Sequence, residues 1–288
     1  MSVERAVLLV EGVNGSAGRS VTGRQSHALL PLGRKTVLQV LLDELVSAGA
    51  EEICVLMGVD DPAVRQFVDA LAGGGALSDD GGGPMVVNLD CIGDGTGGGE
   101  VSGLLEARAF VGDEPFMLAT TCSPIYHMRG SGSLLRRMTQ TLEATGADGV
   151  VAVRDLCGSD LSMRTVVEPV GNPGGGPHFV VADLVDRPLT LERRSRTGLI
   201  NRFVLSPIIF DYLQEQVRGP GEDWGLVTAL RRLARDRQAL WAVRMSAGEI
   251  CFDLSSFLLY SRTFIHFSLE DPEVGTAIQE YLRNLVLN

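Results

Sequence analysis

The chain has 288 residues, of which 45% are hydrophobic and 21% charged, and its formal net charge is −11. This composition is that of a globular protein, and the acidic balance argues against nucleic acid as a default partner. We expect no signal peptide, because no basic region followed by an apolar core opens the sequence. We expect no membrane span, because no apolar run approaches roughly 20 residues. The five cysteines are an odd number without a CxxC pair, which indicates free thiols in a reducing cytoplasm.

Strands and helices are predicted to alternate through the first half of the chain. Short apolar runs predict strands over 5–11, 52–58, 85–91, 115–121 and 149–155. Helical periodicity occupies 36–49, 61–73, 100–110 and 133–146, with Thr36 as a cap and Gly49 near a stop. The alternation predicts a mainly parallel sheet with helices on both faces.

The second half is richer in predicted strands and ends in helices. The β-like segments are 164–171, 178–188, 199–207 and 239–245. Helices are predicted over 206–217 and 226–236, and again in the last thirty or so residues. No long linker separates the two halves.

The first predicted strand runs into a loop rich in Gly, Ser and Arg, "LLVEGVNGSAGRSVTGRQ" (8–25). Ligands of α/β sheets bind outside the carboxyl ends of the strands, which is where this loop begins. Its backbone N–H groups could cradle a phosphate. The loop is therefore a candidate ligand site.

Six segments resemble, in the same order, those of the bacterial UTP–glucose-1-phosphate uridylyltransferases, which belong to the sugar nucleotidyltransferase superfamily. They are "RAVLLVEG", "LLPLGRKTVLQVLLDELVSAGAEEICVLMG", "FVGDEPFML", "VADLVDRP", "RFVLSPIIFDYL" and "FSLEDPEVGTAIQEYLRNL". The resemblance covers nearly the whole chain. It implies a Rossmann-like, mainly parallel (mixed) sheet with helices on both faces, a β-rich sugar-binding lobe and C-terminal helices.

The resemblance also implies an organisation and a reaction. We expect one domain over 1–288, with a nucleotide-binding half (1–155), a sugar-binding lobe (156–253) and C-terminal helices (254–288). The family joins a sugar 1-phosphate to the α-phosphate of UTP and releases pyrophosphate. A divalent ion, usually Mg²⁺, offsets the charge of the transition state.

The carboxylates that bind this ion in the family are replaced here. The family ends its fourth strand with Gly-Asp-Asp, where this chain has Thr121, Cys122 and Ser123. Its second metal-binding Asp, in Tyr-Asp-Cys-Gly-Asp, corresponds to Ser256, although Asp253 matches the first Asp. A thiol and hydroxyls are poor Mg²⁺ ligands, so we expect no metal site, and Mg²⁺ only if the protein is active.

The residues that the resemblance assigns to ligands are partly altered. The nucleotide-binding candidates in the opening loop are Gly12, Val13, Gly15, Arg19 and Arg24. On the sugar side, Glu168 matches a family Val-Glu-Pro segment, Asp186 stands for a sugar-binding Glu, and Arg187 stands for a phosphate-binding Lys. Gly99–Gly103 fills the base-recognition loop with a bulkier, acidic sequence.

Other readings of single motifs remain open. Cys122 with His127 could act as a nucleophile and base, and Asp90, Asp94 and Glu100 could form a substitute metal site. Arg193, Arg194 and Arg196 could clamp a phosphate. A stripe of aromatic residues at helical spacing is either core or a dimer contact; it consists of Phe257, Tyr260, Phe264 and Phe267.

The sequence leads to one main functional hypothesis and two alternatives. The main one is an inactive relative of the uridylyltransferases that binds UTP or a sugar nucleotide and acts as a regulatory, ligand-sensing or assembly partner. It would form a homodimer or join an active nucleotidyltransferase. The alternatives are an active sugar-1-phosphate nucleotidyltransferase with rebuilt metal ligands, and a scaffold that binds no nucleotide.

Overall fold

The computed structural model describes residues 3–10, 27–57, 61–72, 85–90, 99–121, 123–128, 132–156, 164–172, 174–188, 195–218, 225–237 and 239–286. Within these residues one nine-stranded sheet has the order β5-β4-β1-β6-β11-β8-β12-β10-β9. Its strands are β1 (Arg5–Val10), β4 (Glu52–Met57), β5 (Met85–Asp90), β6 (Phe116–Thr120), β8 (Gly149–Asp155), β9 (Val166–Pro169), β10 (His178–Val185), β11 (Thr197–Leu205) and β12 (Leu240–Arg244).

The sheet is mixed, because β11 and β10 each run antiparallel to the strands on both sides of them. β1, β4, β5 and β6 are parallel to one another, and β8 is parallel to β12. β11 runs antiparallel to both β6 and β8 and lies between them. The first half of β11 therefore lies beside the carboxyl ends of both neighbours. The strands of the expected sugar lobe continue this same sheet.

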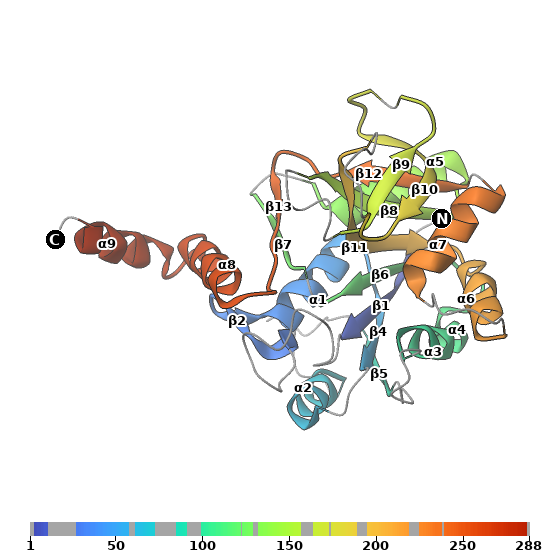
Figure 1. Ribbon diagram of the computed structural model, residues 1–288. Coiled ribbons are helices and arrows are strands. Elements are labelled where there is room, and N and C mark those ends of the chain that lie inside the picture. Colours follow the sequence, from blue (N-terminus) through green and yellow to red (C-terminus); the bar gives the residue numbers. More distant parts are fainter. Residues whose placement is uncertain are drawn as a thin grey trace.

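Helices cover both faces of the sheet (Figure 1). The described helices are α1 (Val37–Ala48), α2 (Pro62–Ala72), α3 (Gly99–Glu106), α4 (Arg108–Val111), α5 (Leu134–Thr145), α6 (Ile209–Arg218), α7 (Leu226–Arg237), α8 (Phe257–Leu269) and α9 (Gly275–Val286). Because strand residues alternate between faces, Leu8 joins the core under α1, α2 and α5, whereas Val7 joins the core under α3, α6 and α7. The expected α/β class is confirmed. Among the described helices, none has the length and apolarity to cross a membrane.

Local signals set the ends of α1 as expected. Thr36 caps the helix, with its hydroxyl accepting from the Gln39 N–H and the Gln39 side chain accepting from the Thr36 N–H. Such a cap contributes about 1 kcal/mol. Gly49 ends the helix at φ 115°, a conformation that favours glycine. Leu38, Leu41 and Leu45 then share the buried face.

Two short strand pairs and one helical turn are not apparent in the sequence. β7 (Ile125–His127) pairs with β13 (Glu249–Cys251), and β2 (Pro31–Leu32) pairs with β3 (Lys35–Thr36). A single helical turn, η2, spans His27–Leu29. The β7–β13 pair brings the segment after β6 next to the segment that precedes α8.

The two C-terminal helices form an arm that extends away from the sheet (Figure 1). α8 packs against β2, and α9 packs mainly on α8. Rings of Tyr126, Phe252, His266 and Phe267 cluster at the base of the arm, with centroids 4.7–6.4 Å apart. Arg34, in the β2–β3 turn, pairs with Asp271 and Glu273 at 2.8 Å. These contacts fix the base of the arm to the rest of the protein.

A fully buried ion pair ties α1 to the middle of the sheet. Arg202 of β11 is 0% exposed, and its Nε and Nη2 donate to the two carboxylate oxygens of Glu44 at 2.9 and 2.8 Å. The guanidinium also donates to the backbone carbonyls of Thr120, Asn201 and Ser123, at 3.5, 2.9 and 3.0 Å. It thereby holds the chain where it leaves β6.

Arg202→Met is expected to lower the free energy of unfolding by about 3–5 kcal/mol, because it leaves the Glu44 carboxylate buried without its partner. Urea denaturation followed by circular dichroism measures the change. Asp211→Asn, which breaks the exposed Arg108–Asp211 pair, is the control and should cost less than about 1 kcal/mol. Equal effects of the two substitutions would contradict the role given to Arg202.

Candidate functional site

The candidate site lies at the carboxyl ends of β1 and β6. These strands are parallel neighbours, and the pairing continues one residue beyond β6, where the Thr121 N–H donates to the Leu9 carbonyl at 3.2 Å. The opening loop follows β1 at this edge. Its candidate residues Gly12, Val13, Gly15, Arg19 and Arg24 lie outside the described residues, so their assignment to a nucleotide stays a prediction.

The described residues that follow β6 are buried, and they contact the guanidinium of Arg202. Thr121 and Ser123 are 1% and 5% exposed, whereas Cys122 is outside the described residues. The Ser123 carbonyl accepts from Arg202, whose charge Glu44 matches. The end of β6 therefore presents backbone oxygens to a guanidinium, and neither Thr121 nor Ser123 has a carboxylate.

Asp253 lies near the end of β6 because the Phe252 N–H donates to the Pro124 carbonyl at 2.9 Å. Its carboxylate accepts from Arg164 Nη2 at 2.5 Å and from the Ser255 N–H at 2.7 Å. A cation bound to this carboxylate would have to displace these two hydrogen-bond donors or lie beside the positively charged Arg164.

Ser256 has a clear structural task. It is the N-cap of α8, in an extended conformation (φ −141°, ψ 158°), and its hydroxyl accepts from the Leu259 N–H at 3.3 Å. Serine is among the residues best suited to this position. The residue that corresponds to the second metal-binding Asp of the family thus begins the helix of the arm.

Mg²⁺ requires near-octahedral coordination by hard oxygen ligands, chiefly carboxylates, phosphates and water. Within the described part of the chain, no three His, Cys, Asp or Glu side chains come together as metal ligands. The side chains of Asp90, Asp94 and Glu100 lie outside it, so the alternative metal site that they could form stays a prediction. At the expected metal positions the described side chains are those of Thr121, Ser123 and Ser256, and hydroxyls of this kind do not fit a Mg²⁺ site.

The sugar-side candidates lie around the β9–β10 pair. Asp186 follows β10 and accepts from the Thr165 hydroxyl at 2.8 Å, so it lies next to the residue that bonds Asp253, Arg164. Arg187 is exposed and has φ 39°, the sole non-glycine residue with positive φ in the described chain. Such backbone strain persists where surrounding structure enforces it and is common at ligand sites.

Glu168 lies in β9, and Asp183 is its cross-strand partner in β10. The Glu168 Oε1 atom is buried and has no hydrogen-bond partner among the described residues. Asp183 instead accepts from Arg231 and Arg235, at 2.9–3.3 Å. Burial raises the pKa of the Asp183 carboxyl. The hydrogen bonds from the two arginines lower the pKa by more than burial raises it, so the net shift is downward. Of the three sugar-side candidates, only Asp186 and Arg187 are adjacent.

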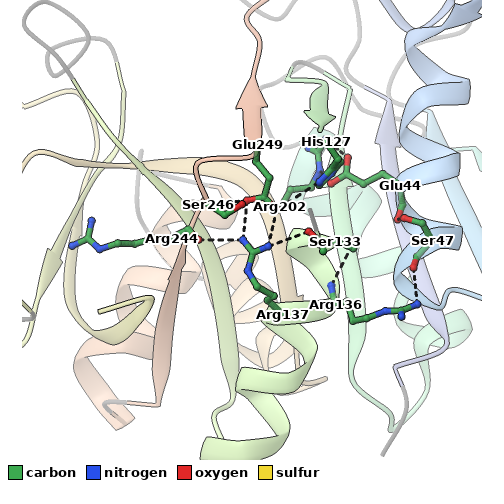
Figure 2. Close-up of polar contacts among 11 residues, drawn as sticks. Glu44, Ser47, His127, Ser133, Arg136, Arg137, Arg202, Arg244, Ser246 and Glu249 are labelled. Carbon is green, nitrogen blue, oxygen red and sulfur yellow. Dashed lines mark hydrogen bonds and ion pairs between the residues drawn. The ribbon is translucent and has the colours of Figure 1, made fainter. Parts of the chain in front are cut away.

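A second polar cluster holds β13 against α5 (Figure 2). The Glu249 side chain is 0% exposed, and it accepts from Arg137 at 2.7 and 2.8 Å and from the Ser246 N–H at 2.7 Å. The His127 Nδ1 lies 3.6 Å from the Glu249 Oε1, too far for a hydrogen bond. His127 therefore contacts Glu249 in this cluster, and its predicted pairing with Cys122 stays untested.

Sequence reasoning missed the charged residues that organise this edge, namely Glu44, Arg137, Arg164, Arg202 and Glu249. Two of them carry a signal in hindsight. Arg202 interrupts the apolar strand "LINRFVL", and Glu44 interrupts the apolar helix face "VLLDELV". Opposite charges inside two core segments indicate a buried pair.

No family model matches the chain. It is 26% identical to UTP–glucose-1-phosphate uridylyltransferase 1 of Streptococcus pyogenes serotype M3, covering 98% of this chain and 94% of that protein. It is 22% identical to the UTP–glucose-1-phosphate uridylyltransferase of Staphylococcus epidermidis, covering 98% of both.

Solved structures share the fold. UDP-glucose pyrophosphorylase from Acinetobacter baumannii superposes with a TM-score of 0.81 at 20% identity, covering 98% of this chain and 99% of that one. The UTP-bound UGPase from the same organism gives 0.78 at 19%, with the same coverage. A UDP-glucose pyrophosphorylase complexed with UDP-glucose gives 0.72 at 18%, covering 92% and 97%.

Glu249 makes stability depend on pH. Burial raises the pKa of its carboxyl, but His127, Arg137 and the Ser246 N–H stabilise the charged form and bring the pKa from 4.5 down to about 2. Because the folded pKa is the lower one, this stabilisation is present above pH 4.5 and is lost as the pH falls toward 2.

Glu249→Gln should therefore lower the free energy of unfolding by roughly 3 kcal/mol near neutral pH, and by progressively less as the pH falls below 4.5. Urea denaturation of both proteins at several pH values measures the difference. Glu51→Gln, at an exposed position, is the control. A difference for Glu249→Gln that is constant with pH would rule out this role.

Proposed function

We propose that this chain, a divergent relative of the UTP–glucose-1-phosphate uridylyltransferases, binds a nucleotide sugar without transferring the nucleotidyl group. The relatives that align with nearly its whole length are named UTP–glucose-1-phosphate uridylyltransferases. We assign to this chain the class of ligand that these relatives' names imply, but not their reaction. The protein would then sense a ligand, regulate a partner or take part in an assembly.

One observation carries the loss of the reaction: the described groups at the expected metal positions have other structural tasks. Ser256 caps α8, Asp253 bonds Arg164, and the Ser123 carbonyl bonds Arg202. Attack of one phosphate on another brings negative charges together, and in this chemistry metal ions neutralise much of the developing charge. Without acids to hold the metal, transfer is slow although binding remains.

The proposed ligand would lie along the edge from the opening loop to the turn after β10. Gly12, Val13, Gly15, Arg19 and Arg24 would contact the nucleotide. Glu168, Asp186 and Arg187 would contact the sugar and its phosphate. Support comes from structural relatives that hold UTP and UDP-glucose. We keep 1–155, 156–253 and 254–288 as the proposed nucleotide-binding half, sugar-binding lobe and C-terminal helices of one domain.

Full-length similarity to proteins named as uridylyltransferases also favours the alternative, an active enzyme with rebuilt metal ligands. Asp90, Asp94 and Glu100 are candidates for those ligands. It predicts that Mg²⁺, UTP and glucose 1-phosphate together give steady turnover.

Pyrophosphate release from UTP, glucose 1-phosphate and Mg²⁺ separates the two functions. The expected result is no release above background, with UDP-glucose binding detected by calorimetry. Turnover above about 1 s⁻¹, within the usual range of enzymes, would establish the active alternative. Absence of heat with UTP and UDP-glucose would instead favour the scaffold.

We also propose that the arm joins two copies of the chain. Six large apolar side chains of α8 and α9 are 37–68% exposed; they are Phe257, Leu258, Phe264, Ile265, Tyr281 and Leu285. The aromatic stripe is divided, since Tyr260 and Phe267 pack on the core. At roughly 200 Å² for each large side chain, the exposed fractions amount to about 600 Å², at the upper end of what monomers expose.

The charge of the arm suits a second copy. Of its four acids, Asp271 and Glu273 pair with Arg34 of the body. The remaining charges of the arm are two acids and two arginines, and Arg34 offsets one of the two acids that it pairs with, so the arm together with Arg34 has a net charge of only −1 on a protein of net charge −11. Two copies could meet there with little repulsion.

Ile265→Glu should weaken self-association at least tenfold, because it places a charge in the apolar contact. Sedimentation equilibrium is the measurement, and Val217→Glu is the control, since Val217 is 44% exposed on α6 and Ile265 is 43% exposed. A wild-type protein that stays monomeric would overturn this interface.

A further inference from the structure

Thr165 and Asp186 lie opposite one another just beyond the end of the β9–β10 pair. The two strands are antiparallel, with Val166 opposite Val185, so the next pair in this register is Thr165 and Asp186. Side chains of directly opposite residues share one face of the sheet and interact. The Thr165 hydroxyl donates to Asp186 Oδ1 at 2.8 Å. The register of the strands therefore accounts for this contact.

Thr165 is the fixed member of the pair. Its backbone carbonyl accepts from the Leu199 N–H of β11 at 2.9 Å, and the next residue, Val166, lies opposite Gly198 of the same strand. Asp186 follows the last residue of β10 and is exposed. The hydrogen bond thus ties the carboxylate of a turn residue to a position that two other strands hold in place.

The turn that Asp186 begins has a strained backbone. Arg187 has φ 39° and is followed by Pro188, which is buried. A residue before proline favours extended conformations with φ of about −120°, so this conformation is unfavourable for two reasons. Such strain persists only where the surroundings enforce it, and it is typical of ligand sites. The buried proline on one side and the Thr165–Asp186 bond on the other hold the turn.

The free oxygen of Asp186 suits one kind of ligand group. Among the described residues, Oδ2 of Asp186 has no hydrogen-bond donor, since the Thr165 hydroxyl contacts Oδ1. A carboxylate only accepts hydrogen bonds. A phosphate is also an anionic acceptor and would be repelled, whereas the hydroxyls of a sugar can donate. The exposed Asp186 is accessible to such a group.

We propose that Thr165 is a positioning residue for ligand binding: it holds one oxygen of Asp186 so that the other accepts from a hydroxyl of the sugar in a bound nucleotide sugar. This inference rests on the proposed function and names the part of the ligand that the turn recognises. Thr165 itself touches no ligand. Its effect is to keep the carboxylate in one orientation, which binding would otherwise have to impose.

The experiment is calorimetric titration with UDP-glucose and with UDP. Thr165→Val keeps the shape of the side chain and removes its hydroxyl. It should weaken UDP-glucose binding about fivefold, as for the loss of one hydrogen bond, and leave the affinity for UDP unchanged. Thr165→Ser retains the hydroxyl and should bind both ligands as the wild type does.

Thr139→Val is the matched control. Thr139 is half-buried like Thr165, and its hydroxyl donates to the Leu135 carbonyl within α5 at 3.0 Å. Its substitution should leave both affinities unchanged. Circular dichroism verifies that each variant is folded.

The strain at Arg187 has a separate readout. Glycine adopts positive φ without steric cost, whereas alanine does not. Arg187→Gly should therefore have a higher urea midpoint than Arg187→Ala. The reverse order would show that the turn is not strained and would remove this support for the inference.

The outcomes separate this inference from the proposed function. UDP-glucose bound by Thr165→Val as tightly as by the wild type, or an equal loss for UDP and UDP-glucose, refutes the role of Thr165 and leaves the proposed function standing. A selective loss in Thr165→Val upholds that role even if pyrophosphate release shows the protein to be an active enzyme. A wild-type protein that binds no UDP-glucose refutes both.

Discussion

The buried pair of Arg202 and Glu44 is the constraint on which this part of the molecule depends. Burying two charges is costly, and the cost is offset only when geometry is good and the remaining donors are used. Both oxygens of Glu44 are engaged, and three backbone carbonyls accept from the same guanidinium. α1, β6 and β11 are thereby fixed relative to one another, and with them the backbone of Thr120 and of Ser123.

The position of that pair has a chemical consequence. A guanidinium under the end of β6 already supplies the positive charge there, and Glu44 already balances it. Nearby, Asp253 is engaged by Arg164, and Ser256 begins α8. Acid–arginine pairs and a helix cap thus occupy the described positions where a cation would otherwise be expected.

Much of the fold could be predicted from the sequence because its signals are local. The cap at Thr36, the stop at Gly49 and the apolar runs of β1, β4 and β6 each act over a few residues. The β7–β13 pair could not be predicted, since each strand has three residues and its partner is distant in the chain.

The site was less predictable for the same reason. The partners Arg202 and Glu44 are 158 residues apart, and Arg164 and Asp253 are 89 apart, so only the folded sheet brings them together. Resemblance pointed to Ser256 as a lost ligand, but it could not show that this serine is the cap of α8. Asp186 and Arg187 were placed by resemblance, and their contact with a sugar stays a prediction.

The most direct test of the central claim is a crystal structure with UDP-glucose and Mn²⁺, with data collected for the anomalous signal of manganese. The account predicts density for the bound nucleotide sugar and no anomalous peak held by acids of the protein. A manganese peak coordinated by Asp253 or another carboxylate beside β1 and β6 would contradict it.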